Sequence, residues 1–210
     1  MEKIGLELET AKEQPKTSRR DIVAIGALAG GLEAISGLLK NLPTTISATI
    51  FAVLHRPPAR LSSLPQILRR ETPLRVAMPH DGTKLQHGTC YVGSTNLHLT
   101  VGSDQKVQLL HDGFYSGHNI DALFCSLARH AGSRTIGVVL SGVDKDGSLG
   151  LKAIKDAGGI ALVQSPEEAS FSDMPRNAIK YGRPVDFVGP VHALANEFSG
   201  SLAAENPDGG

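Results

Sequence analysis

The chain has 210 residues, and a composition with 40% hydrophobic and 20% charged residues is typical of one soluble globular domain. Its 21 basic residues balance its 21 acidic ones, which removes the electrostatic argument for nucleic acid or an anionic membrane as a partner. No stretch approaches the roughly 18 apolar residues of a membrane span, so we expect no membrane insertion. The low number of cysteines and the lack of an apolar leader favour a cytoplasmic location.

The two ends of the chain differ in composition from its centre. Residues 1–20 are polar and charged, and they predict a flexible arm before the first strand. Residues 199–210 contain Gly, Ser, Asn and Pro and predict a disordered tail. The segment 21–198 between them is expected to form the folded domain.

Within this segment, short apolar runs alternate with stretches of helical periodicity. The predicted strands lie at 22–25, 49–54, 89–92, 97–101, 107–110, 136–140 and 160–163. The predicted helices lie at 32–42 with Pro43 closing the helix, around 61–68, and at 119–131, 148–157, 175–181 and 190–198. Gly, Asn and Asp interrupt the short strands between 74 and 110, which favours an inserted antiparallel hairpin region. The alternation predicts an α/β fold with a doubly wound, mostly parallel central sheet.

In such folds chemistry collects at the carboxyl ends of the strands, and three of these ends stand out. The first strand runs into the small-residue turn 26–31, where a helix N-terminus could approach an anion closely, although a close-packed turn explains the same glycines. The second end carries His55, and the third carries Asp146. A histidine and an aspartate at neighbouring strand ends are two of the three members of a hydrolase triad.

Three ligand-binding motifs fail at these turns. A dinucleotide fingerprint requires glycine where Leu28 stands, and a Walker loop requires Gly-Lys-Ser/Thr where the chain has Gly31-Leu32-Glu33. Asp144 and Asp146 resemble the start of a calcium loop, but the twelfth position is Lys155 rather than glutamate. We therefore expect no metal and no cofactor.

Longer motifs make the chain resemble the chemotaxis protein-glutamate methylesterases, the CheB family. The opening motif is Ile25-Gly26-Ala27-x-Ala29-Gly30-Gly31-Leu32-Glu33-Ala34-Ile35. Further matches are Leu54-His55-x-Pro57-Pro58, Asp81-Gly82, Gly88-x-x-Tyr91-Val92, Leu140-Ser141-Gly142, Asp146-Gly147, the stretches 149–154 and 157–159, and the long segment 164–179. The likeness runs in order from about Asp21 to Phe198.

This resemblance implies an α/β fold with a central parallel sheet. It also implies hydrolysis of methyl esters on receptor glutamates with release of methanol, and often deamidation of receptor glutamines. Methyl-accepting chemotaxis receptors or related signalling proteins are the implied partners. The phosphorylation domain that normally precedes this part of the family is not found in the sequence, so we expect no phosphorylation control within this chain.

The resemblance also implies roles for residues at the three strand ends. His55 matches the general base, and Asp146 matches the aspartate that orients it. Leu28 stands where the family has its nucleophilic serine, and leucine has no group that attacks a carbonyl. The residues implied for the substrate-binding or oxyanion region are Gly26, Ala27, Ala29, Gly30, Gly31, Val143 and Met174.

Other positions also depart from the family pattern. Asp144 and Lys145 stand where the family usually has glycine and a small or polar residue, and the usual Arg-Pro pair before Ile120-Asp121 is missing. Ser141 or Ser148 would replace the missing serine only by reaching the histidine, and the family uses both positions for structure.

Two functions of different classes follow from these departures. One is a methylesterase of the CheB family that Leu28 leaves impaired. The other is a pseudoenzyme that binds receptors or signalling proteins without turnover. A nucleotide-binding module is a third class, for which we expect no nucleotide-induced stabilisation.

Overall fold

The structure is a computed structural model that describes residues 19–43, 45–55, 64–94, 96–111, 117–181 and 184–203. Its centre is a seven-stranded sheet in which all described pairings are parallel. Across the sheet the strands are, in order, β3 (Arg75–Ala77), β4 (Thr89–Val92), β2 (Thr49–Leu54), β1 (Ile22–Ala27), β7 (Thr135–Val139), β8 (Ile160–Gln164) and β9 (Phe187–Gly189). The predicted α/β fold with a mostly parallel sheet is confirmed.

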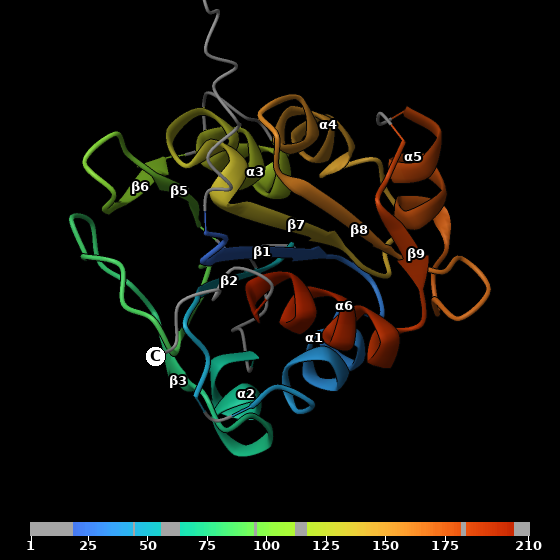
Figure 1. The fold of residues 1–210 in the computed structure, drawn as a ribbon, viewed down its shortest axis with the longest axis horizontal. Helices are drawn as coiled ribbons and strands as arrows, with labels where there is room; N and C mark the ends of the chain where they lie inside the picture. The colour runs from blue at the N-terminus through green and yellow to red at the C-terminus, as the bar shows by residue number, and fades with distance from the viewer. Residues whose placement is uncertain are drawn as a thin grey trace, which may run out of the picture.

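Helices cover both faces of this sheet (Figure 1). One face carries α1 (Gly31–Leu39), α2 (Leu64–Glu71) and α6 (Val191–Ala203). The other carries α3 (Asn119–His130), α4 (Ser148–Asp156) and α5 (Asp173–Tyr181). The short 3₁₀ helix η1 (Gly132–Arg134) links α3 to β7. Each face therefore has its own apolar core.

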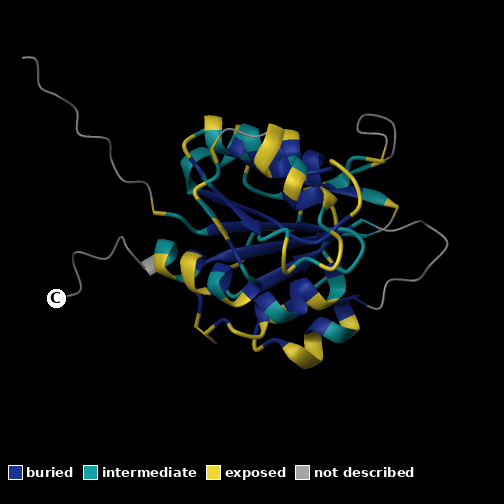
Figure 2. Ribbon diagram, turned by 90° about the vertical axis from the view of Figure 1, so that its right-hand side faces the viewer, coloured by how far each residue is buried: buried dark blue, intermediate teal, exposed yellow. Residues whose placement is uncertain are grey.

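The central strand β1 is apolar because it lies between these two cores. All six of its residues are buried, with Val23 and Ile25 facing the α1 side and Ile22 and Ala24 facing the α3 side. A parallel strand covered on both faces is a continuous hydrophobic run rather than an alternating one. Figure 2 shows the buried strands in dark blue between helices whose outer surfaces are exposed.

The inserted hairpin is smaller than the sequence predicts. Among the described strands, β5 (Leu97–Val101) and β6 (Val107–His111) form the one antiparallel pair, and this pair packs on α3. Strands β3 and β4 instead pair in parallel at the edge of the main sheet, so assigning the whole stretch 74–110 to a hairpin region is wrong. The segment 78–88 connects these two strands and returns the chain for their parallel pairing.

Several element boundaries also move. Helix α1 ends at Leu39, before Pro43, and β1 extends two residues past Ile25 to Ala27. Helix α6 continues to Ala203, which corrects the tail predicted from residue 199 for its first part. The predicted arm at 1–18 and the rest of the tail at 204–210 lie outside the described residues.

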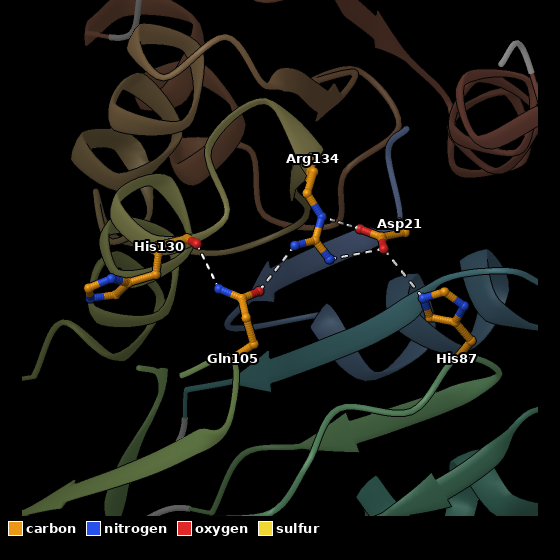
Figure 3. Close-up of polar contacts among 5 residues, drawn as sticks. All are labelled: Asp21, His87, Gln105, His130 and Arg134. Carbon is orange, nitrogen blue, oxygen red and sulfur yellow. Dashed lines mark hydrogen bonds and ion pairs between the residues drawn. The ribbon is translucent and has the colours of Figure 1, made fainter. Parts of the chain in front are cut away.

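At the opposite end of β1 from the predicted site, a polar cluster ties distant segments together (Figure 3). Arg134 donates to both carboxylate oxygens of Asp21, at 2.9 Å each, and to the Gln105 side-chain oxygen at 3.2 Å. Gln105, in the β5–β6 turn, donates to the His130 carbonyl at 2.7 Å. His87 Nε2 lies 3.4 Å from the same aspartate. The Arg134 guanidinium thus joins the start of β1 to the hairpin, and Gln105 joins the hairpin to the end of α3.

We expect Arg134→Lys to lower the free energy of unfolding by about 1 kcal/mol, because lysine keeps the charge but loses the planar fork that bonds two oxygens at once. Urea denaturation measures the change. Arg129→Lys, at an exposed position of α3, is the matched control and should leave stability unchanged. Equal stability of both variants would contradict a structural role for the bidentate pair.

Candidate active site

The three predicted strand ends meet at the middle of the sheet. Leu28 follows β1, His55 follows β2, and Asp146 lies between β7 and α4, and β2 and β7 are the two neighbours of β1. The backbone bonds extend past the strands, since the Leu28 N–H donates to the Ser141 carbonyl at 2.9 Å and the His55 N–H to the Ala27 carbonyl at 3.0 Å. The strand order changes direction at β1, with β2 on one side and β7 on the other. Doubly wound folds place their sites at the carboxyl ends of strands next to such a point.

The turn after β1 is glycine-rich because its surroundings leave no room for side chains. Gly30 has a φ of +70° and caps α1, and a Cβ there would lie 2.7 Å from Ser141 Oγ. A Cβ on Gly31 would lie 2.7 Å from a Leu54 methyl, and one on Gly26 would overlap Ile120. These glycines therefore serve close packing, as the alternative interpretation of the turn required.

Two backbone N–H groups of the same turn remain for an anion. Those of Leu28 and Gly31 donate to carbonyl oxygens of Ser141 and Leu28. Those of Ala29 and Gly30 have no hydrogen-bond partner in the described part of the chain. Adjacent N–H donors at a helix start are the kind of group that stabilises an oxyanion.

Leu28 brings an apolar side chain to this place. It is half-buried and packs on the core cluster of the α3 face. A Cβ built on Gly142 would lie 2.9 Å from Leu28 Cβ and would overlap Met174 Sδ, so these three residues adjoin one another. Met174 is fully buried, whereas Val143 is 49% exposed at the rim. Leu28 thus adds hydrocarbon next to Gly142 and Met174 at the carboxyl end of β1.

The Asp146 carboxylate is held by the N-terminus of α3. Its side chain is buried, and its two oxygens accept the N–H groups of Ile120 at 3.0 Å and Asp121 at 2.9 Å. Burial raises the pKa of the Asp146 carboxyl above its ordinary value, and these two donors and the charges of His118 and His55 partly oppose the rise. A carboxylate at a helix N-terminus is electrostatically favoured.

His55 contacts a residue that the sequence did not single out as a site residue. Its Nδ1 lies 3.0 Å from the side-chain nitrogen of Asn119, the first residue of α3. Within the described residues, the hydrogen bond of the ring is to Asn119 and those of Asp146 are to backbone. The sequence signal was available, because Asn119 directly precedes the pair Ile120-Asp121 where the family motif is interrupted.

Neither serine near the site is placed as a substitute nucleophile. Ser141 is 1% exposed, and its Oγ donates to the Ala29 carbonyl at 2.8 Å and accepts the Phe171 N–H at 3.0 Å. Its own N–H donates to Gln164, whose amide in turn bonds Glu168. Ser148 is also buried, in the first turn of α4. Ser141 therefore supports the loops around the site, whereas the buried Ser148 Oγ has no hydrogen-bond partner among the described residues.

Charged side chains line the rim beside Asp146. Asp144 and Lys145 are exposed, and Asn177 donates to the Asp144 carbonyl at 3.2 Å. Together with Arg176 and Lys180 they line an open cavity of about 420 Å³. The rim thus offers both charges to a peptide or protein surface.

Two negative findings concern only the residues that the structure describes. They contain no group of three or more His, Cys, Asp or Glu side chains arranged to hold a metal ion. None of their helices is long and apolar enough to cross a membrane.

Fold and site together define an α/β domain with hydrolase-type residues at the carboxyl ends of its central strands. The profile of the CheB methylesterase family matches residues 23–198, and the chain belongs to this family.

Named relatives agree with this assignment. The protein-glutamate methylesterase/protein-glutamine glutaminase 2 of Pseudomonas aeruginosa is 34% identical over 86% of this chain and 53% of its own length. The corresponding protein of Geobacillus kaustophilus is 36% identical over 83% and 51%. The CheB methylesterase catalytic domain of Thermotoga maritima superposes with a TM-score of 0.78 at 28% identity, over 88% of this chain and 98% of that one. The chain spans about half the length of the curated relatives it matches.

A second buried carboxylate makes the stability of this region depend on pH. Asp121 accepts the Gly150 N–H at 2.7 Å. Burial raises the pKa of the Asp121 carboxyl, the bond from Gly150 opposes the rise, and the charge of Asp146 adds to it. Because the folded state holds this proton more tightly than the unfolded chain, Asp121 contributes stability at acid pH and loses it as pH rises through the raised pKa.

Asp121→Asn keeps an oxygen for Gly150 and removes the charge. We expect the free energy of unfolding of the variant minus that of the unchanged protein to be more positive at about pH 7 than at about pH 4, so that the variant is relatively more stable at pH 7. Urea denaturation at both pH values tests the sign. Asp104→Asn is the control, since Lys106 lowers the pKa of this exposed carboxyl. Its difference in free energy of unfolding between the two pH values should have the opposite sign. A pH-independent difference for Asp121→Asn would contradict the raised pKa.

Proposed function

We propose that residues 21–198 form a CheB-type protein-glutamate methylesterase domain whose ester hydrolysis is impaired by Leu28. The observation that carries this proposal is the position of Leu28 at the end of the central strand, between the ends that bear His55 and Asp146. The proposed substrates are glutamate methyl esters on methyl-accepting chemotaxis receptors or related signalling proteins. The proposed location is the cytoplasm, with residues 1–20 as an arm before the domain.

Ester hydrolysis by this family of sites needs three chemical groups. A nucleophilic oxygen attacks the ester carbonyl, a base accepts the proton of that oxygen, and N–H donors stabilise the negative carbonyl oxygen that forms. The turn supports the last requirement through Ala29 and Gly30, and His55 is the proposed base. The missing group is the attacking oxygen, because the side chain of Leu28 is hydrocarbon.

The size of the loss follows from triad chemistry. Removal of the serine from a Ser-His-Asp triad leaves roughly 10³–10⁴-fold acceleration over water, supplied by the oxyanion donors and by binding. His55 could still activate a water molecule, but a rate at this level is far below that of a working esterase. The buried positions of Ser141 and Ser148 support the same conclusion.

A non-catalytic binding role is the second candidate, and the charged rim favours it. The exposed Val143 and the side chains of Asp144, Lys145, Arg176 and Lys180 surround an open cavity next to the site. Such a mixed apolar and charged surface suits a protein segment, and it does not require turnover. In this role Asp146 supports the structure of the binding surface.

Leu28→Ser should restore methanol release from methylated receptor, by about 100-fold or more over the unchanged protein, because it supplies the attacking oxygen beside His55. Methanol released by purified protein is measured. Leu28→Ala is the matched control, since it removes the leucine without adding a hydroxyl, and it should stay inactive.

Other outcomes of this assay separate the two candidate functions. If the unchanged protein released methanol as fast as Leu28→Ser, the impaired-enzyme proposal would be wrong. Absence of activity in Leu28→Ser would show that the cleft has changed beyond position 28 and would favour the binding role.

A further inference from the structure

The contact between His55 and Asn119 restricts where the imidazole carries its proton. The side-chain nitrogen of Asn119 lies 3.0 Å from His55 Nδ1. An amide nitrogen donates hydrogen bonds and does not accept them, so the ring nitrogen that it faces must be the acceptor. A neutral imidazole with an unprotonated Nδ1 carries its proton on Nε2.

Hydrolytic triads use the opposite tautomer. There the aspartate accepts a hydrogen bond from Nδ1–H, which leaves Nε2 free to take the proton of the nucleophile. In this chain the Asp146 oxygens already accept the N–H groups of Ile120 and Asp121, at 3.0 and 2.9 Å. The residue that faces Nδ1 is Asn119, on the same helix start.

We infer that Asn119 is a positioning residue that holds His55 with Nδ1 as an acceptor and Nε2–H as a donor. The ring then presents a hydrogen-bond donor where hydrolysis requires a base. Its chemical complement is an oxygen acceptor, such as the side-chain carbonyl of a glutamyl ester or of glutamine. The inference rests on the proposed function, since it concerns the same cleft. Because His55 in this state lacks the tautomer of a triad base, we expect Leu28→Ser to recover only part of the rate of a complete triad.

Nitrogen NMR of the full chain reads the tautomer directly. Long-range ¹H–¹⁵N spectra are recorded at about pH 8.5, where an ordinary histidine is neutral. His55→Gln identifies the His55 signals among those of the eight histidines. We expect the unchanged protein to show Nδ1 as the unprotonated nitrogen and Nε2 as the protonated one.

Two variants test whether Asn119 causes this state. Asn119→Asp has the same shape but only accepts hydrogen bonds, so the proton should move to Nδ1. Asn119→Ala should shift the Nδ1 resonance toward that of an imidazole without a donor partner. Asn41→Ala removes an exposed amide that bonds the Gly37 carbonyl, and it should leave the His55 signals unchanged.

A protonated Nδ1 in the unchanged protein would overturn the inference. It would also be overturned if the His55 signals of Asn119→Asp and Asn119→Ala were the same as those of the unchanged protein. The spectrum of the unchanged protein decides the tautomer even if a variant fails to fold. No turnover is needed, so failure of Leu28→Ser to release methanol would count against the proposed function while leaving this result intact.

Discussion

The bond between the Asp146 carboxylate and the start of α3 is the constraint on which the geometry of the strand-end site depends. It joins the loop after β7 to the helix that packs over β1, and it is buried. Because the first backbone N–H groups of α3 point at this carboxylate, Asn119 is brought to the His55 ring, on the far side of β1. Loss of the Asp146 carboxylate would leave the N–H groups of Ile120 and Asp121 without an acceptor, and would loosen the loop, the start of α3 and the imidazole together. Asp146, which the family motif assigns to catalysis, thus also has a structural role that does not depend on catalysis.

Much of the fold could be predicted from the sequence because the central strands are buried on both faces. A continuous apolar run such as Thr49–Leu54 has one favourable environment, and its predicted limits are those of β2. The three-residue strand β3 could not be found in this way, since Arg75–Ala77 is too short for a period and its first residue is exposed. Its parallel pairing with β4 depends on contacts across the sheet rather than on local composition. Helix α6 likewise continues past Phe198 with Leu202 packed on the core cluster of the α1 face, which local polarity does not reveal.

The candidate site was predictable to the level of strand ends but not of hydrogen bonds. Motif order placed Leu28, His55 and Asp146 at carboxyl ends, and the parallel topology brings those ends together. Which side chain faces the imidazole depends instead on the exact start of α3. If α3 began one residue earlier or later, Asn119 would no longer face the imidazole, and sequence patterns locate the ends of a helix least well. The family motif supplied roles for the residues, while the contacts made by this chain come from its own helix start.

Leu28 touches the scaffold in two separable ways. Its N–H and carbonyl fasten the turn to Ser141 and Gly31, and any amino acid other than proline would supply the same two groups. Its half-buried side chain adds hydrocarbon beside Met174 and packs on the core cluster of the α3 face. The backbone bonds of the turn therefore do not depend on which side chain occupies position 28. A domain of this family can therefore lose its attacking oxygen while keeping the backbone bonds of the turn, so a shared fold in this family is weak evidence of shared turnover.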